Sequence, residues 1–385
     1  MDIRDLTADD LDAVLDIRKR SFGLLAVADA QTWRAAVLPT LAQGRYLGAF
    51  DGDRLVATAR LRSFTQWWHG RPQPMAGVAG VTVSPEDRGR GLGTTIMRAA
   101  LARAGSFGDA VSALFPATTP IYRSLGFEHA GARYQVSLPA AALRAVVPSQ
   151  QVKLRRMGPG DAAEVVSVLH RVHAATRASG PMSWDEDTWR LWLDDKDDFL
   201  YLAEDGFLVY RWDGSDMEVD NLVAGSAETA RALWSVVGSS SSIAERVTAT
   251  VAPDDPVLWL LRERTKERIT RDPWMFRVLD VAEAVRRRGY PAVLTATAVV
   301  QVNDPLVEGN TGRWRLEFAE GAGVATALET AAAAGPVLSV NAFSALYAGI
   351  PTATLRGSGL MSGDERYDEV LDAAFAARPY MLDHF

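Results

Sequence analysis

The alternation of apolar and polar positions predicts the same strand, turn and helix at two places along the chain. Residues 3–14 and residues 154–165 each predict a short strand, a turn that ends in aspartate and an amphipathic helix. The aspartate oxygen can accept hydrogen bonds from the free N–H groups of the first helical turn. Two further pairs of similar segments follow in the same order, namely 46–49 with 201–204 and 78–83 with 219–224. This order favours a duplicated α/β domain, although two unrelated strand–turn–helix units can also match by chance.

The pattern changes after the second copy. Residues 262–271 are dense in charge and are expected to form an exposed helix or loop, and residues 278–285 predict a capped amphipathic helix. Residues 295–302 and 312–318 alternate as strands do, and the alanine-rich residues 325–334 predict a helix. These elements indicate a third domain of the α+β type.

The fold class predicted from these patterns is α/β (α+β), with two tandem similar domains and a smaller α+β domain at the end. A linker between the copies is expected at residues 138–152, which combine prolines, alanines and polar residues. The three domains are expected at residues 1–145, 146–285 and 286–385.

Composition narrows the classes of protein that the chain can belong to. It has 385 residues, of which 48% are hydrophobic, a net charge of −7 and no cysteine. These values exclude a disordered chain, a disulfide framework, a zinc–thiolate site and a thiol nucleophile. The acidic charge argues against nucleic-acid binding, and the charged first residues with no apolar run of about 18 residues argue against a membrane partner. We therefore expect a cytoplasmic protein.

Two histidines have helical spacing, and this pattern could suggest a metal site. His170 and His173 lie three residues apart, but the sequence offers no third ligand beside them. We expect two partly exposed histidines and no bound metal.

The sharpest chemical signal is the run from Val81 to Thr94, Val-Thr-Val-Ser-Pro-Glu-Asp-Arg-Gly-Arg-Gly-Leu-Gly-Thr. A β-branched strand enters a loop with three alternate glycines and two arginines, and a helix is expected to begin at about Thr94. Amide groups at a helix start attract an anion, and glycines let the backbone approach it closely. The loop therefore predicts a pyrophosphate site. It is neither a Walker loop nor a Gly-x-Gly-x-x-Gly dinucleotide loop, and the remaining alternative is a plain glycine-rich turn.

This run resembles the acyl-CoA pyrophosphate loop of the GNAT N-acetyltransferases. The segment 120–127, with tyrosine, arginine, glycine and phenylalanine, resembles another stretch of that family. Two GNAT-like copies followed by a small α+β domain resemble the Eis (enhanced intracellular survival) acetyltransferases over essentially the whole chain. The resemblance implies a second, degenerate GNAT-like domain and a third domain like sterol carrier proteins. It also implies acetyl-CoA as cosubstrate, bound by Val81, Val83, Arg88, Gly89, Arg90, Gly91, Gly93 and Thr94.

The second copy lacks this loop. Residues 224–231 stand in its place, with one glycine and an acid where the arginines would be. A carboxylate beside a pyrophosphate would repel it, so we expect one CoA site in each chain, in the first domain.

The resemblance also implies the groups that move protons. Tyr122 is expected to be the general acid, and the alternative is a tyrosine that only packs at a corner of the fold. The carboxylate of Phe385 at the chain end is expected to be the base, and the alternative is a disordered tail. His384 is a rival base, and Asp383 could supply negative charge to a cationic acceptor.

The acceptor site is expected beside the first two helices. Phe22 and Trp33 either line it or belong to the core, and Gly80 would leave room next to the CoA strand. The acidic runs at residues 185–187 and 194–198 could attract polyamines, but a charged helix face is the favoured interpretation.

The function expected from the resemblance is direct acetyl transfer from acetyl-CoA to primary amines of polycationic acceptors, such as aminoglycosides, cationic peptides or lysine side chains. The resemblance further implies a homohexamer. Alternatives are a GNAT enzyme with longer acyl-CoA donors, and a non-catalytic CoA sensor or lipid carrier. A carrier would need a large apolar tunnel in residues 286–385.

Overall fold

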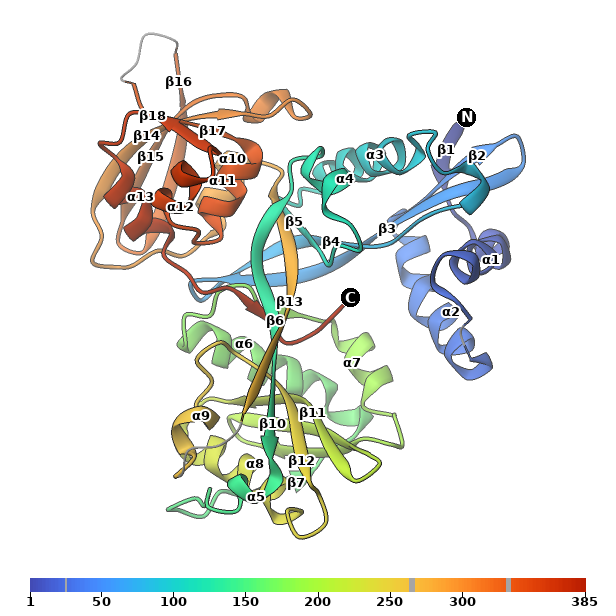
Figure 1. Cartoon of the computed structure of the whole chain (residues 1–385), viewed down its shortest axis with the longest axis vertical. Helices are drawn as coiled ribbons and strands as arrows, with labels where there is room; N and C mark the ends of the chain where they lie inside the picture. Colours follow the sequence, from blue (N-terminus) through green and yellow to red (C-terminus); the bar gives the residue numbers. More distant parts are fainter. Residues whose placement is uncertain (25, 263–266, 330–333) are drawn as a thin grey trace.

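The computed structural model describes residues 1–24, 26–262, 267–329 and 334–385, with the backbone alone for residues 27–29. The chain forms a first unit, a second unit and a third unit in sequence order (Figure 1).

The first unit contains strands and helices in the order of a mixed α/β domain. Its elements are β1 (Asp2–Asp5), α1 (Leu11–Phe22), α2 (Val27–Ala42), β2 (Tyr46–Asp51), β3 (Arg54–Trp68), β4 (Arg71–Val83), α3 (Leu92–Ser106), β5 (Val111–Leu114), α4 (Thr119–Arg123), β6 (Glu128–Pro139) and α5 (Ala140–Leu143). The expected linker therefore begins inside β6 and α5, which pack on the second unit, and only its later part lacks helix and strand.

The second unit repeats much of this order. Its elements are β7 (Arg155–Arg156), α6 (Ala162–Ala175), β8 (Met182–Ser183), α7 (Glu186–Trp192), β9 (Phe199–Ala203), β10 (Gly206–Asp213), β11 (Asp216–Ala224), α8 (Ala227–Ser239), β12 (Arg246–Val251), α9 (Val257–Leu260) and β13 (Arg268–Val278).

One continuous sheet joins the two units. Its strand order is β1-β2-β3-β4-β5-β13-β6-β12-β11-β10-β9-β7. Strand β13 leaves the second unit and inserts between β5 and β6 of the first, with Met275 opposite Leu114. The expectation of a helix or loop at residues 262–271 was therefore wrong for residues 268–271, which begin this strand, while residues 263–266 lie outside the described residues. Pairing with a distant strand outweighed the local charge pattern.

In each of the first two units, two parallel strands pair over three residues and then separate. Strand β4 pairs with β5 at residues 75–77. It then continues to Val83 without pairing with β5. Strand β11 pairs with β12 at residues 217–219 and continues to Ala224. The matching geometry confirms the duplication inferred from the sequence.

The third unit is a separate sheet covered by helices (Figure 1). Its elements are α10 (Val281–Arg287), β14 (Ala296–Asn303), β15 (Gly312–Ala319), β16 (Ala322–Leu328), β17 (Pro336–Ser339), α11 (Val340–Tyr347), α12 (Thr352–Gly357), β18 (Met361–Gly363), α13 (Asp368–Phe375) and β19 (Tyr380–Met381), of which β19 pairs with β6. The helix expected at 325–334 was wrong, since residues 325–328 belong to β16 and pair with β15; residues 330–333 lie outside the described residues.

Aromatic rings fill the interior of the third unit. Tyr290, Phe318, Phe343, Tyr347 and Phe375 are all buried, and their rings contact one another at centroid distances of 4.8–6.2 Å. The rings therefore form the core between the sheet and the helices of this unit.

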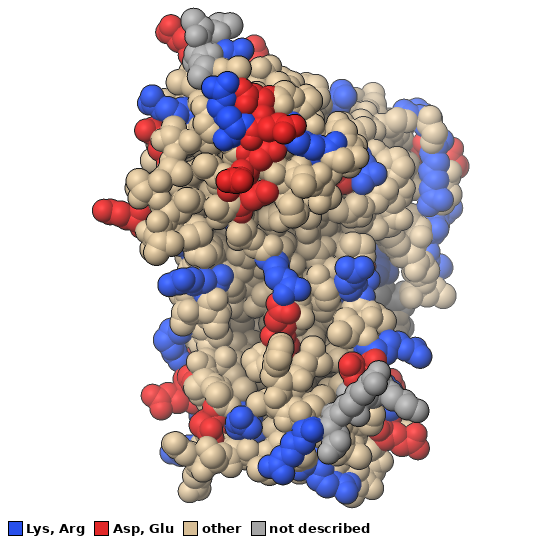
Figure 2. Space-filling view, turned by 60° about the vertical axis from the view of Figure 1, so that its left-hand side comes forward, with Lys and Arg blue, Asp and Glu red and all other residues tan. Residues whose placement is uncertain are grey.

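The chain end crosses back from the third unit and finishes between the first and second units (Figure 1). Among the described residues, no helix has both the length and the apolarity to cross a bilayer. On the face drawn in Figure 2, acidic and basic side chains are interspersed.

Candidate active site

The loop after β4 places main-chain groups at the start of α3. Gly89 and Gly91 have φ values of 81° and 76°, a region that favours glycine. Gly91 directly precedes α3, which begins at Leu92 and not at Thr94 as expected, because this left-handed residue turns the chain straight into the helix. A Cβ on Gly93 would lie 2.9 Å from Ile121, so this glycine lets α3 and α4 approach. The N–H groups at this helix start suit an anion.

The two loop arginines differ in their surroundings. Arg88 is exposed, whereas Arg90 pairs with Asp87 and Asp51. Asp87 also accepts hydrogen bonds from Arg54, which lower the pKa of its carboxyl, with Arg90 acting in the same direction. Val81, Val83 and Thr94 are half-buried around the loop. The observed pairing means that Arg90 must leave or share its aspartates to contact a pyrophosphate.

At the corresponding place in the second unit, the amides of the loop before α8 already have partners in the chain. Ser226 accepts a hydrogen bond from the N–H of Thr229 at the start of α8, and the N–H of Gly225 donates to the carbonyl oxygen of Asp205 at 2.7 Å. Asn221, on the separated half of β11, donates to Asp383 of the tail at 3.4 Å. The amides of this loop are therefore bonded to the chain's own groups, whereas a cavity of about 210 Å³, lined by Leu222, Ala224 and Ala252 among others, lies beside the separated half of β11.

Tyr122 lies in α4, directly after β5. Its side chain is buried, and its ring centroid is 6.1 Å from that of Phe127. Burial raises the pKa of the hydroxyl above its ordinary value, so the phenol keeps its proton at neutral pH. A protonated phenol beside the strand separation suits a proton donor.

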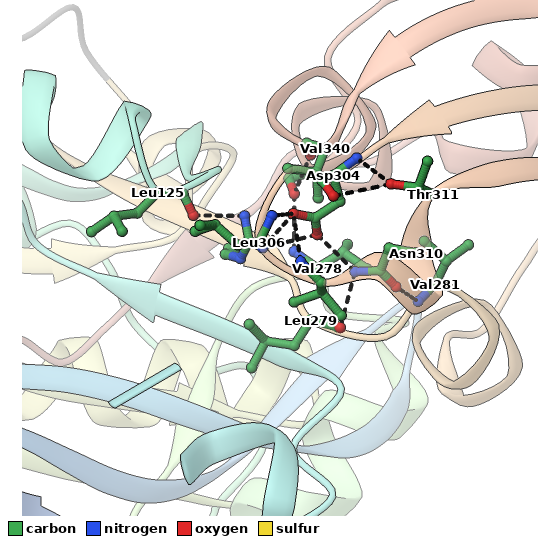
Figure 3. A network of polar contacts seen from close by, with 12 residues as sticks. Leu125, Val278, Leu279, Val281, Asp304, Leu306, Asn310, Thr311 and Val340 are labelled. Carbon is green, nitrogen blue, oxygen red and sulfur yellow. Dashed lines mark hydrogen bonds and ion pairs between the residues drawn. The ribbon is translucent and has the colours of Figure 1, made fainter. Parts of the chain in front are cut away.

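The turn after Tyr122 is held by Arg277 of β13, whose partner Asp304 belongs to the third unit. The Arg277 guanidinium donates to the carbonyl oxygen of Leu125 at 2.6 Å and to Asp304 at 2.8 Å, with both charged side chains fully buried (Figure 3). Asp304 also accepts a hydrogen bond from Asn310 at 2.9 Å. Sequence reasoning missed this network. The sequence signal for this network was Arg277, the one charged residue in the apolar run 274–279.

Phe385 is docked where β4 and β5 separate. Its ring is 4.8 Å from the ring of Phe64 and 5.6 Å from that of Phe115. Gly77, in the last pair of β4 with β5, has no space for a Cβ, which would lie 2.8 Å from the Phe385 ring. The interpretation of a disordered tail is therefore wrong.

His384 and Asp383 face different surroundings. The His384 ring stacks on Phe115 at 4.1 Å, and burial lowers the pKa of its imidazole while Asp272 opposes that change. Asp383 points toward the second unit, and burial raises the pKa of its carboxyl to about 6. His384 is thus neutral near pH 7 and could accept a proton.

An acidic pocket of about 310 Å³ lies beside this tail. Its acidic lining residues are Asp195, Asp198, Asp220 and Asp383, and its aromatic ones are Trp189, Trp192 and His384. Burial raises the pKa of Asp220 to about 6, and Arg211 pairs with both Asp198 and Asp220. The expectation of a charged helix face was wrong for residues 194–198, which form a turn after α7. Asp185, by contrast, caps that helix.

A second pocket, of about 240 Å³, lies under α1 and α2 in the first unit. Phe22 and Trp33 both line it, and so does Gly80 of β4. Trp33 also packs against the core, so both interpretations of this residue hold.

The histidines of α6 provide no metal centre. His173 is buried, contrary to expectation, and burial lowers the pKa of its imidazole to about 3. Its ring packs beside Trp67 at 5.9 Å, which explains the burial. Within the described part of the chain, no group of three metal-ligating side chains is found.

Comparison with known proteins agrees with this geometry. Two family models of the acetyltransferase (GNAT) domain match residues 2–130 and 180–278. The family model of a sterol carrier protein domain matches residues 281–382. The chain is therefore a GNAT-class acetyltransferase with two GNAT domains and a sterol-carrier-like third domain.

Relatives narrow the class. A crystal structure of a GCN5-related N-acetyltransferase from Kribbella flavida is 44% identical, with a TM-score of 0.95 over 100% of this chain and 98% of that one. An uncharacterized N-acetyltransferase of Streptomyces griseus is 30% identical over 79% of this chain and 80% of its own length. N-acetyltransferase Eis of Mycobacterium tuberculosis is 26% identical over 96% of both chains. The chain belongs to the Eis family of GNAT N-acetyltransferases, a class that uses acetyl-CoA as cosubstrate.

Proposed function

We propose that this chain transfers an acetyl group directly from acetyl-CoA to a primary amine, with its own terminal carboxylate as base. The observation that carries this proposal is the docking of Phe385 where β4 and β5 separate. The contacts with Phe64 and Phe115 fix the terminal residue at this point, where its carboxylate can accept a proton.

Acetyl-CoA would be held by main-chain groups of the first unit. The separated half of β4, with Val81 and Val83, has main-chain groups not paired with β5, and these suit the amides of the pantetheine arm. The loop from Arg88 to Thr94 suits the pyrophosphate, since its left-handed glycines bring amide groups to the start of α3. When bound, acetyl-CoA supplies the activated thioester carbonyl.

Two groups of this chain transfer protons in the proposed reaction, the Phe385 carboxylate and the Tyr122 hydroxyl. The Phe385 carboxylate accepts a proton from the ammonium of the acceptor, so that the free amine can attack the carbonyl carbon. The new bond is C–N and the broken bond is C–S. The Tyr122 hydroxyl donates its proton to the departing sulfur. The Phe385 carboxylate releases the first ammonium proton to solvent and then accepts the second proton, which the nitrogen loses as the C–N bond forms. This second proton restores the phenol through solvent.

The acceptor belongs, in this proposal, to the polycationic amines such as aminoglycosides, cationic peptides or lysine side chains. The acidic pocket beside Asp383 supports a cationic group next to the chain end. We also propose a division into domains at residues 145/146 and assembly as a homohexamer. The second expected boundary, at 285/286, would cut α10, so we propose that the third domain begins with this helix at Val281. Light scattering on the purified chain tests the assembly.

The chain end is tested by extension. Two glycines added after Phe385 move the carboxylate away from the ring's position. Thiol release from acetyl-CoA with an amine panel should fall by about 100-fold or more, the usual scale for a lost general base, with acetyl-CoA binding retained. The matched control carries two glycines before Met1. Equal turnover in the two extended chains would move the base to another group, with His384 next.

Tyr122 is tested by the substitution Tyr122→Phe, which keeps the packed ring. We expect kcat to fall by about 10²- to 10⁴-fold. Tyr134→Phe is the matched control, and activity within about fivefold of the parent would remove Tyr122 from the acid role.

A further inference from the structure

Three arginines line the pocket under α1 and α2, and no acidic side chain lines it. Arg18 comes from α1, and Arg60 and Arg62 come from the same face of β3. The remaining polar lining consists of uncharged hydroxyls, those of Tyr46, Thr58 and Thr82. The pocket is therefore a site of concentrated positive charge.

The arginine charges have no carboxylate partners among the residues that the structure describes. Arg60 is 7% exposed and donates to Thr40 Oγ1 at 2.8 Å and to the carbonyl oxygen of Ala36 at 2.6 Å. The guanidinium of Arg62 lies 4.1 Å from the ring centroid of Trp184. In the described part of the chain, neither of them nor Arg18 has an acid within ion-pair distance.

The buried arginines elsewhere are compensated in other ways. Arg45 pairs with Asp109 at 2.8 Å and Arg277 pairs with Asp304. Arg288 is enclosed by aromatic rings and is not open to a ligand. Within the described ranges, Arg133 lines the acidic pocket without an ion pair, but four aspartates line that pocket with it, whereas no acid lines the pocket of Arg18, Arg60 and Arg62.

Both β3 arginines keep their charge at neutral pH. Burial lowers the pKa of Arg60 to about 10. Burial, followed by repulsion from Arg60, lowers the pKa of Arg62 to about 9, and Asp185 acts in the opposite direction. Holding such charges out of water and near each other costs free energy, which a bound anion would offset.

The pocket adjoins the reacting centre. Gly80 has a φ of 57° and lies on the half of β4 that has separated from β5. On the other side, Arg62 is 5.7 Å from the Phe64 ring, and that ring is 4.8 Å from the ring of Phe385. A small molecule in this pocket therefore reaches toward the terminal residue.

We propose that the pocket of Arg18, Arg60 and Arg62 binds a carboxylate carried by the acceptor amine. The inference rests on the proposed acetyl transfer and narrows its acceptor from the polycationic amines as a whole to those that also carry a carboxylate, which leaves amino acids and peptides and excludes aminoglycosides. The acceptor is a zwitterion of the amino-acid or peptide type, with its carboxylate among the arginines and its amine at the terminal carboxylate. An acceptor that is cationic throughout would leave the arginines unpaired.

Matched amines that differ only in a carboxylate test this. The pairs are L-lysine with 1,5-diaminopentane and L-ornithine with 1,4-diaminobutane. For the native chain we expect kcat/KM to favour the carboxylated amine by about 10- to 100-fold, the scale of a charged hydrogen bond. Arg62→Gln and Arg18→Gln should each reduce that preference, taken as the ratio of the two kcat/KM values of a pair, by about 10-fold.

The controls separate charge from structure. Arg20→Gln removes an exposed arginine of α1 that pairs with Asp16 outside the pocket, and it should keep the native preference. Arg62→Lys should restore part of the preference that Arg62→Gln loses, which a purely structural role would not predict.

The outcomes distinguish the inference from the function beneath it. Turnover of both members of each pair at equal kcat/KM overturns the carboxylate site and leaves the acetyltransferase intact. A preference seen only for phosphoethanolamine over ethanolamine overturns the carboxylate assignment in favour of phosphate. If no amine is turned over, the proposed reaction fails. Calorimetric titration of L-lysine into the native chain and Arg62→Gln then still decides the site, since equal affinity in both overturns it.

Discussion

The side-chain amide of Asn341 donates to the carbonyl oxygens of Arg123 at 2.9 Å and of Phe127 at 2.8 Å. Asn341 lies in α11 of the third unit, and the two carbonyls bracket the turn that follows the Tyr122 helix. The sterol-carrier-like domain therefore positions a segment of the first GNAT domain, in addition to delivering the chain end.

Asn341→Ala should weaken this connection. Two carbonyl groups would lose their donor, and one of them belongs to the buried Phe127, so we expect a loss of about 1–3 kcal/mol and a lower melting temperature. If the turn positions Tyr122, kcat should fall while the KM for acetyl-CoA changes little. Asn303→Ala, an exposed asparagine of the same unit, is the control. A lower melting temperature with native kcat would limit Asn341 to a structural role.

Substitution in the buried ion pair of Arg277 and Asp304 should destabilise the protein more than Asn341→Ala does (Figure 3). Asp304→Ala leaves a buried guanidinium unpaired, at a cost of about 3–5 kcal/mol, whereas Glu186→Ala in the exposed pair with Arg190 should cost about 0–1 kcal/mol. Thermal unfolding measures both. Adding Arg277→Met to Asp304→Ala should recover stability, because the uncompensated charge is removed. A double variant no more stable than Asp304→Ala would contradict this account.

Asp383 should make stability depend on pH in a direction opposite to that of an ordinary ion-paired acid. Because burial raises its pKa to about 6, the native state binds a proton more tightly than the unfolded state does. This contribution is full below about pH 4 and is lost as the pH rises through 6. Asp383→Asn should therefore raise the free energy of unfolding at pH 7.5 by up to about 3 kcal/mol, which is measured as a higher melting temperature. At pH 4 it should have little effect.

The same variant tests the acidic pocket. A polyamine such as spermidine bound there would stabilise the Asp383 carboxylate, so it should raise the melting temperature of the native chain more than that of Asp383→Asn at pH 7.5. An identical shift in both chains would show that Asp383 does not contribute to cation binding.

Local patterns account for much of what the sequence predicted. The turn into α3 rests on glycines close together in the chain, and the strands at 295–302 and 312–318 alternate clearly. The cap of α10 was likewise readable, since Asp280 accepts a hydrogen bond from the N–H of Glu283. Each of these features is decided within about 15 residues.

Long-range pairing explains what could not be predicted. The insertion of β13 between β5 and β6, and the pairing of alanine-rich β16 with β15, depend on partners that local propensity does not identify. The arginine pocket carried a weak signal. Arg60 and Arg62 alternate with Ala59 and Leu61, which placed both arginines on one face of a strand, but not beneath α1.

The space at Gly77 should decide whether the chain end can reach its place. In Gly77→Ala the new Cβ would lie 2.4 Å from the Phe64 ring and 2.8 Å from the Phe385 ring, so one ring must move. Strand β4 is fixed on both sides by β3 and β5, so the Phe64 ring must turn, and the Phe385 ring that packs on it must shift as well. We expect kcat to fall by about 10-fold or more, with acetyl-CoA affinity largely retained, because the base is displaced from its site. Phe64→Leu in the same chain should return space to the terminal ring and recover part of kcat, and Phe64→Leu alone is the control. Native kcat in Gly77→Ala would show that the reaction does not depend on the docked position of Phe385.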